Sequence, residues 1–92
     1  MFNYDNTALN NLVGVVPDDL CLLSGLEKID VSGNSLNGEI PACLAALPRL
    51  SYIAVQDNNL EGSLVPFCEV DHVDNLFADC DLVACPCCTD CP

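Results

Sequence analysis

Positive charge is scarce in this 92-residue chain, because Lys28 and Arg49 are its two basic residues against 14 aspartates and glutamates, for a formal net charge of −12. Proteins that bind nucleic acid or anionic lipid neutralise phosphates with clustered lysines and arginines. This composition therefore disfavours both kinds of partner. An apolar run of about 18 residues, the length needed to cross a bilayer, is also missing. We expect no membrane span within this chain.

Motifs of catalysis are missing as well. The chain has one histidine, His72, and neither a G-x-S-x-G nucleophile motif nor a phosphate-binding loop. Its carboxylates are scattered, whereas a Ca²⁺ site needs about six convergent oxygen ligands. We therefore expect a protein that is not an enzyme and has no cofactor or bound metal.

A secretion signal is not recognisable in residues 1–6, which offer neither a basic region nor an apolar segment. Eight cysteines in so short a chain are nevertheless typical of secreted, disulfide-stapled proteins. We resolve the conflict with the expectation that the chain is the C-terminal part of a longer secreted or membrane-anchored protein, or a truncated gene model. It would then lie outside the cell or at its surface, and an intracellular metal binder is the weaker alternative.

What the chain does contain is a near-repeat. Residues 26–38 read LEKIDVSGNSLNG and residues 50–62 read LSYIAVQDNNLEG, with apolar positions, asparagines and final glycines in register. A fixed period of this length is the signature of stacked units, each of which needs a neighbour to bury its apolar edge. The positions expected to point inward are Leu26, Ile29, Val31, Leu36, Ile40, Leu44, Leu47, Leu50, Leu60 and Leu64.

The pattern L-x-x-L-x-L-x-x-N-x-L-x-G resembles the leucine-rich repeat, in the plant-type form that continues G-x-I-P. Residues 38–41 read GEIP, and residues 14–17 read GVVP one coil earlier. The resemblance implies an α/β fold, namely a short right-handed solenoid of about 2.5 coils with a parallel sheet on its concave face. It also implies a non-enzymatic extracellular recognition module that binds a protein or glycan ligand through that face.

Local structure follows from the alternation within each repeat. Short parallel strands are predicted over residues 28–32 and 52–56. Asn34 and Asn58 follow them at a buried turn, where an amide both donates and accepts, so we predict a structural ladder of stacked asparagines. After Pro41, residues 42–47 should form one turn of α or 3₁₀ helix on the convex side, which Pro48 ends.

The first coil is degenerate. A strict repeat would place Asp5 inward without a partner, whereas an alternative alignment with a short insertion over residues 10–12 keeps Phe2 and Tyr4 inward, and we prefer it. In either alignment the chain begins inside a coil. We expect an uncapped apolar edge that drives end-to-end self-association, formed by Phe2, Tyr4, Leu9, Leu12, Val13 and Val16.

The repeat is lost from Cys68 onward, which divides the chain into leucine-rich repeats at 1–67 and a Cys-rich C-terminal cap at 68–92. The cap holds six of the eight cysteines: Cys68, Cys80, Cys85, Cys87, Cys88 and Cys91. Residues 77–80 (FADC) and 85–91 (CPCCTDC) resemble the C-terminal cap of diatom and algal leucine-rich-repeat proteins, whose pattern has a cysteine where Pro92 stands. A disulfide knot shields a last coil without a core of its own.

Disulfides are the interpretation we favour for these six cysteines, while a Zn²⁺ or Cu⁺ thiolate site and free thiols stay open. Spacing does not fix their pairing. Cys21 and Cys43 lie on convex segments at non-equivalent positions, so they form either a bridge or two buried free thiols.

Outward strand positions are the candidate ligand contacts: Lys28, Asp30, Ser32, Tyr52 and Gln56, with Asp57 at the edge. Stacking should place Lys28 beside Tyr52 and Asp30 beside Ala54. This assignment rests on analogy with the family, and ordinary solvent-facing residues are the competing interpretation. A purely structural role, as the capping segment of a longer ectodomain, is the alternative function, and thiolate metal binding is the weaker third.

Overall fold

The computed structural model describes residues 13–91, which form two parallel sheets and a row of short helices. The first sheet has the order β2 (Lys28–Asp30), β4 (Tyr52–Ala54) and β6 (Asn75–Phe77). The second has the order β1 (Val13–Gly14), β3 (Ser35–Gly38) and β5 (Asn59–Leu60). Each sheet takes every other strand of the chain, as expected for stacked units.

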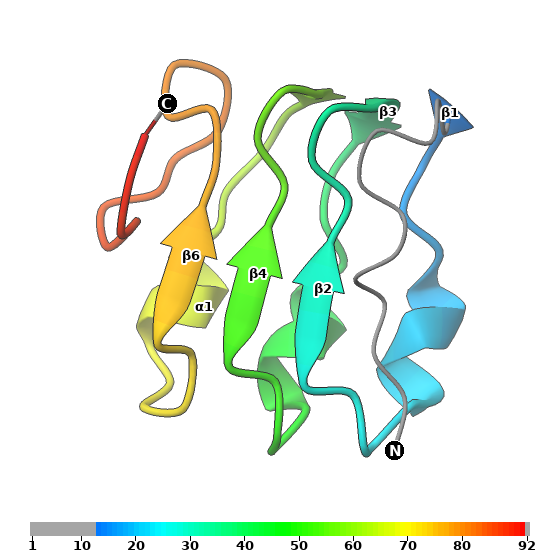
Figure 1. The fold of residues 1–92 in the computed structure, drawn as a ribbon, viewed down its shortest axis with the longest axis vertical. Coiled ribbons are helices and arrows are strands. Elements are labelled where there is room, and N and C mark those ends of the chain that lie inside the picture. The colour runs from blue at the N-terminus through cyan, green and yellow to red at the C-terminus, as the bar shows by residue number, and fades with distance from the viewer. Residues whose placement is uncertain (1–12, 92) are drawn as a thin grey trace.

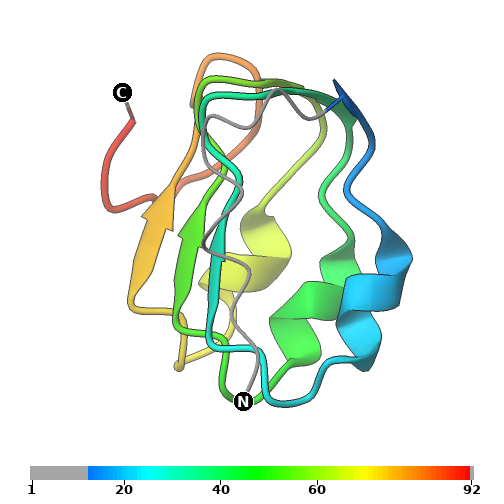
Figure 2. The same cartoon turned by 45° about the vertical axis from the view of Figure 1, so that its right-hand side comes forward.

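Helical turns close each unit on the side away from the first sheet (Figures 1 and 2). They are the 3₁₀ helices η2 (Asp18–Leu22) and η3 (Ala42–Ala46) and the α-helix α1 (Val65–Cys68). Pro17 and Pro41 precede the two 3₁₀ helices, and each proline carbonyl accepts a hydrogen bond from the N–H three residues on. The convex turn predicted over residues 42–47 is therefore 3₁₀ and ends one residue early.

Strand pairing follows the sequence repeat. Lys28 pairs with Tyr52 and Ile29 with Ile53, at the predicted period, whereas Ile53 pairs with Leu76 at a period one residue shorter. The strands predicted over 28–32 and 52–56 were too long, because the chain turns off the sheet after Asp30 and Ala54. Gly33 and Asp57 make these turns with positive φ values of 72° and 61°.

The core is a single cluster of buried apolar side chains between the sheets and helices. Every inward position predicted from the repeat is buried, which confirms that part of the pattern. Leu26 and Leu50 are completely buried, and a fully buried leucine contributes roughly 1.5–3 kcal/mol relative to an exposed one. Phe67 of α1 joins the same cluster, as do Leu76 and Val83 from the residues that follow the repeats.

β6 extends the first sheet beyond the predicted end of the repeats. Leu76 and Ala78 take the buried positions that Ile29 and Val31 hold two strands earlier, and both are at most 2% exposed. The leucine spacing does not signal this strand, because its connection to β4 is one residue short.

The expected N-terminal edge is only partly within the described residues. Phe2, Tyr4, Leu9 and Leu12 lie outside them, as does the choice between the two alignments of the first coil. Val16 is 5% exposed, so its place on an open edge was wrong. It precedes Pro17 as Ile40 precedes Pro41, and it faces the same core cluster. None of the helices within residues 13–91 has the length and apolar character that a membrane crossing requires.

Candidate recognition face and disulfide cap

A row of side chains crosses the outward face of the first sheet, which we call the outward sheet face. The Lys28 ammonium lies 4.7 Å from the centroid of the Tyr52 ring, a cation–π distance. The Tyr52 and Phe77 ring centroids are 5.5 Å apart with planes tilted by 51°, an arrangement typical of favourable aromatic pairs. Strands β2, β4 and β6 thus contribute one side chain each to a continuous row.

Phe77 was not among the predicted contacts. Its strand keeps the alternation of the others, since buried Leu76 stands between Asn75 and Phe77, which are half-buried. That alternation was the available signal, but the strand lies after the predicted repeats and pairs at a period one residue shorter.

Asp30 and Ser32 are bound to each other at the end of β2. One Asp30 carboxylate oxygen accepts hydrogen bonds from the Ser32 hydroxyl at 2.7 Å and from the Ser32 N–H at 3.2 Å. Asp30 lies in register with Ala54, as predicted, but Ala54 is 2% exposed and offers no contact surface. Ala54 therefore contributes no accessible group to the outward sheet face.

Gln56 and Asp57 form the turn that follows β4. The Gln56 carbonyl accepts hydrogen bonds from the Gly33 N–H and the Asn58 amide, while its side-chain Oε1 is buried and has no hydrogen-bond partner within the described residues. Asp57 is exposed and takes the left-handed conformation that Gly33 takes one repeat earlier. Aspartate tolerates this conformation better than most residues, so Asp57 has a turn-forming reason to be here as well.

The asparagine side chains bond to the backbone at the turns, and Asn58 also joins two successive repeats. Asn34 donates to the carbonyls of Val31 and Ser32 at 2.8 and 3.2 Å. Asn58 donates to the Val55 carbonyl of its own repeat at 3.1 Å and to the Val31 carbonyl of the preceding repeat at 3.0 Å. Its Oδ1 accepts the Leu36 N–H at 3.0 Å. Both amides therefore serve backbone groups that the turn leaves without sheet partners.

Asp79 continues this network, and sequence reasoning missed its role. Its carboxylate accepts the Asn58 N–H at 3.2 Å, just as Asn58 accepts an N–H from the preceding repeat. Its backbone carbonyl accepts the N–H groups of Leu82 and Val83. The position of an acid soon after an apolar strand, in Phe77 to Cys80, was the signal that could have identified it.

Disulfides hold the segment after the repeats. The structure pairs Cys68 with Cys87, Cys80 with Cys91 and Cys85 with Cys88. The Cα atoms are 5.4–5.6 Å apart in each pair, within the normal range. The prediction of disulfide bonds is confirmed, whereas thiolate metal binding would require these bonds to be reduced.

A fourth disulfide joins the two 3₁₀ helices. Cys21 of η2 and Cys43 of η3 are bonded across a Cα separation of 5.9 Å, so the alternative of two buried free thiols was wrong. The two positions are not equivalent in their helices, yet η2 and η3 lie against each other closely enough for the bond to form.

The last described residues cover the far edge of the first sheet and pair with the segment after β5. Thr89 donates its N–H to the Leu76 carbonyl at 2.7 Å and accepts the Leu76 N–H at its hydroxyl, and Asp90 forms a parallel bridge with Phe77. After β5, the Leu64 N–H donates to the Ala84 carbonyl at 2.8 Å, and Ser63 forms a parallel bridge with Ala84. Backbone groups that would be unpaired at these positions are thereby satisfied.

Comparisons with known proteins agree with this geometry. Residues 25–47 match the family model described as Leucine Rich Repeat. A comparison with curated proteins found no match. Among solved structures, the chain is similar to a chain of the BIR3–SERK2 complex from Arabidopsis thaliana, with a TM-score of 0.68 and 30% sequence identity. The match covers 75% of this chain and 38% of that chain, so this chain spans well under half the length of the solved one. These findings support a leucine-rich-repeat protein.

Proposed function

We propose that this chain is a non-enzymatic recognition module that binds a protein partner through the outward sheet face. The proposal is supported by the general use of leucine-rich repeats in protein recognition and by the similarity to a chain solved as part of the BIR3–SERK2 complex. The observation that carries it is the row formed by Lys28, Tyr52 and Phe77. Of the predicted contacts, Lys28 and Tyr52 belong to this row, while Asp30, Ser32, Gln56 and Asp57 flank it.

Rings held by their neighbours are suited to recognition. Aromatic residues are enriched at interface centres, and a side chain already fixed in the free protein loses little entropy on binding. Tyr52 is held between the Lys28 ammonium and the Phe77 ring. Because the chain as a whole carries a net charge of −12, a partner with basic groups around an apolar centre would complement it.

The proposal extends to the architecture and location of the chain. We propose a right-handed solenoid of about 2.5 coils with plant-type repeats at 1–67 and a cap of the diatom and algal kind at 68–92. The module would belong to a longer secreted or membrane-anchored protein and act outside the cell. Four disulfides within the described residues support an oxidising compartment.

Binding assays with matched variants test the function. The immobilised chain is screened against a panel of secreted-protein ectodomains and against a glycan array, and each hit is titrated. Tyr52→Ala and Phe77→Ala should each weaken binding about tenfold or more, the loss typical of a central aromatic contact. Leu22→Ala is the matched control, because Leu22 is 80% exposed on η2, away from the outward sheet face.

The outcomes separate the alternatives. A hit that all three variants bind equally well would place the ligand elsewhere. Glycan hits without protein hits, weakened by the same two variants, would favour a glycan ligand. A purely structural capping role is the second candidate, and it is favoured by the pairing of residues 84–90 with the edge of the first sheet and with the segment after β5. Grafting residues 63–91 onto an uncapped leucine-rich-repeat array should then raise the melting temperature of that array.

A further inference from the structure

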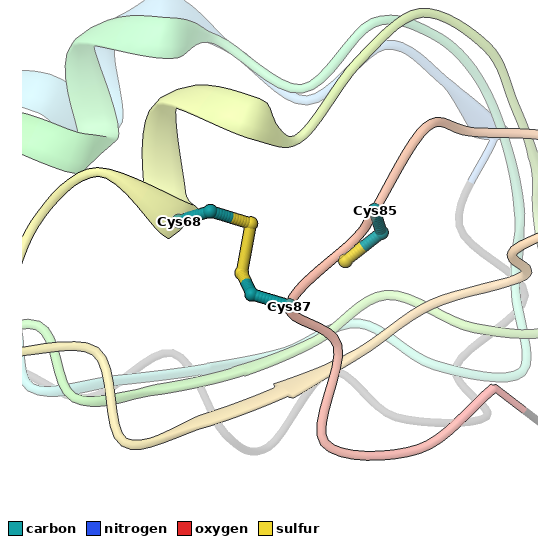
Figure 3. A group of neighbouring side chains, drawn as sticks. All are labelled: Cys68, Cys85 and Cys87. Atoms are coloured by element: carbon teal, nitrogen blue, oxygen red, sulfur yellow. A yellow bond between two sulfur atoms is a disulfide. The ribbon is translucent and has the colours of Figure 1, made fainter.

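The three disulfides of the cap lie in a row whose sulfur atoms are close across neighbouring bonds. The Sγ atoms of Cys68, Cys87 and Cys85 all lie within 4.8 Å of one another. In Figure 3 the Cys85 sulfur points toward the Cys68–Cys87 bond. Cys85 belongs to a different disulfide, so each sulfur of one bond has a sulfur of the next within reach.

The same arrangement exists at the other end of the row. The Sγ atoms of Cys80, Cys91 and Cys88 also lie within 4.8 Å of one another. Since Cys88 is bonded to Cys85, the Cys85–Cys88 disulfide stands between the two outer disulfides and touches both groups. The Cys21–Cys43 bond belongs to neither group.

Disulfides exchange when a thiolate attacks a sulfur of another disulfide and a second thiolate leaves. Groups already held near contact react far faster than the same groups free in solution. Cys91 and Cys87 are exposed, so an external thiol can reach both outer bonds, whereas Cys85 and Cys88 are partly buried against the core. When an outer disulfide is reduced, a new thiol therefore already lies close to a sulfur atom of the central disulfide.

We propose that the cap is a site of thiol–disulfide exchange, in which the Cys85–Cys88 bond passes one of the two thiols of a reduced outer disulfide to the other outer disulfide. A small-molecule dithiol first reduces Cys80–Cys91. The dithiol is oxidised to its disulfide, and its two electrons and two protons leave thiols on Cys80 and Cys91.

The internal steps neither consume nor release electrons. One of the new thiols loses its proton, and the thiolate attacks the Cys88 sulfur. A bond to Cys88 forms, the Cys85–Cys88 bond breaks, and Cys85 leaves as a thiolate. Cys85 then attacks a sulfur of the Cys68–Cys87 bond, and the released Cys68 or Cys87 thiolate takes up the proton.

Transfer of one thiol changes which segments the cap disulfides hold in place. Cys91 follows Asp90, which bridges to Phe77 at the edge of the first sheet, and Cys68 ends α1. A reductant acting at the exposed end can thus release α1 at the other end. This inference stands apart from the proposed ligand face and does not depend on it.

Limited reduction with mass mapping tests the proposal on the full chain. The protein, at several concentrations, is treated with the same limiting concentration of dithiothreitol at mildly alkaline pH, quenched with acid over a time course, alkylated and mapped. We expect crossed pairs that join Cys88 to Cys80 or Cys91 and Cys85 to Cys68 or Cys87. Their rate should be independent of protein concentration and should rise about tenfold per pH unit below the thiol pKa.

Two variants provide the matched comparison. Without the central bond, in Cys85→Ser/Cys88→Ser, thiols should stay on the outer pair that was opened. Cys21→Ser/Cys43→Ser should exchange like the wild-type chain. Wild-type samples that show only the original three pairings, or crossed pairs whose rate scales with protein concentration, would overturn the proposal, even if the first variant fails to fold.

Discussion

The repeats and the cap are held together in different ways. Between Leu26 and Gly62, successive units are joined by stacked leucines and by the amide of Asn58. Between Cys68 and Cys91, three disulfides join a segment with few buried side chains of its own. Periodic packing needs many equivalent residues, whereas a cross-link needs two cysteines at the right separation. Periodic packing is therefore visible in the sequence as a repeat, whereas cross-linking is visible only as a high cysteine content.

If packing holds the repeats together, the loss of a core leucine should have the largest effect on the free energy of unfolding. Leu50 is completely buried, so Leu50→Ala should lower the free energy of unfolding by about 2–5 kcal/mol, through lost transfer energy and the cavity left behind. Chemical denaturation measures this loss. Leu22→Ala, at an exposed position, should change stability by no more than about 0.5 kcal/mol. Equal losses in the two variants would show that the repeats are not held by this packing.

Removal of one cap disulfide should have the next largest effect. Cys68 and Cys87 are 19 residues apart, and a cross-link over about 15 residues contributes roughly 3 kcal/mol in the chain-entropy account. Cys68→Ser/Cys87→Ser should therefore lower the free energy of unfolding by about that much, and thermal denaturation measures the change. The control is Cys85→Ser/Cys88→Ser, whose bond spans a separation of 3 and should cost less. The reverse order would mean that loop closure is not what the cap disulfides supply.

Loss of an amide between repeats should cost less than loss of a disulfide. Asn58→Leu leaves the Leu36 N–H and the Val31 and Val55 carbonyls without this partner, and we expect a loss of about 1–3 kcal/mol. Gln56→Ala, next to it, should stay within about 0.5 kcal/mol, because the hydrogen bonds of Gln56 described above use its backbone carbonyl. Similar losses for both would contradict the ladder.

The smallest expected effect lies at the junction of the two regions. Asp79→Ala removes the acceptor of the Asn58 N–H and should cost about 1 kcal/mol. Asp79→Asn keeps an acceptor oxygen and should recover most of that loss. Amide hydrogen exchange at Asn58 is the direct measurement, and it should speed up in Asp79→Ala and not in Asp79→Asn. Unchanged exchange in both variants would remove Asp79 from the network.

Much of the repeat region could be predicted from the sequence. The leucine spacing identified the buried positions, and the period identified the pairing of Lys28 with Tyr52. The strand ends could not be placed, since they depend on backbone turns at Gly33 and Asp57. Val16 was misplaced because it was assigned to the edge with the rest of the degenerate first coil, whereas it precedes Pro17 as Ile40 precedes Pro41 and packs into the same core.

The cap and the outward sheet face were less accessible to prediction. Cysteine content indicated disulfides, but pairing depends on how the chain folds back, which spacing does not encode. Phe77 ends a strand that has a single leucine and pairs at a period one residue short, and Asp79 follows it, so the repeat pattern does not indicate either residue. Their roles depend on the pairing of β6 with β4.

Asp79 also shows how small a chemical change distinguishes the last member of the network from the member before it. Asn58 and Asp79 both accept an N–H from the preceding repeat, but the Asn58 amide also donates, to the Val31 carbonyl of that repeat and to the Val55 carbonyl of its own. A carboxylate has no proton to donate when ionised, so at Asp79 it can accept an N–H but cannot serve a carbonyl. The difference is one NH₂ group replaced by one oxygen, which is the change that spontaneous deamidation makes. At Asn58 the same reaction would leave the Val31, Val55 and Gln56 carbonyls without their amide donor, and the hydrogen bonds of this amide to four backbone groups oppose the reaction.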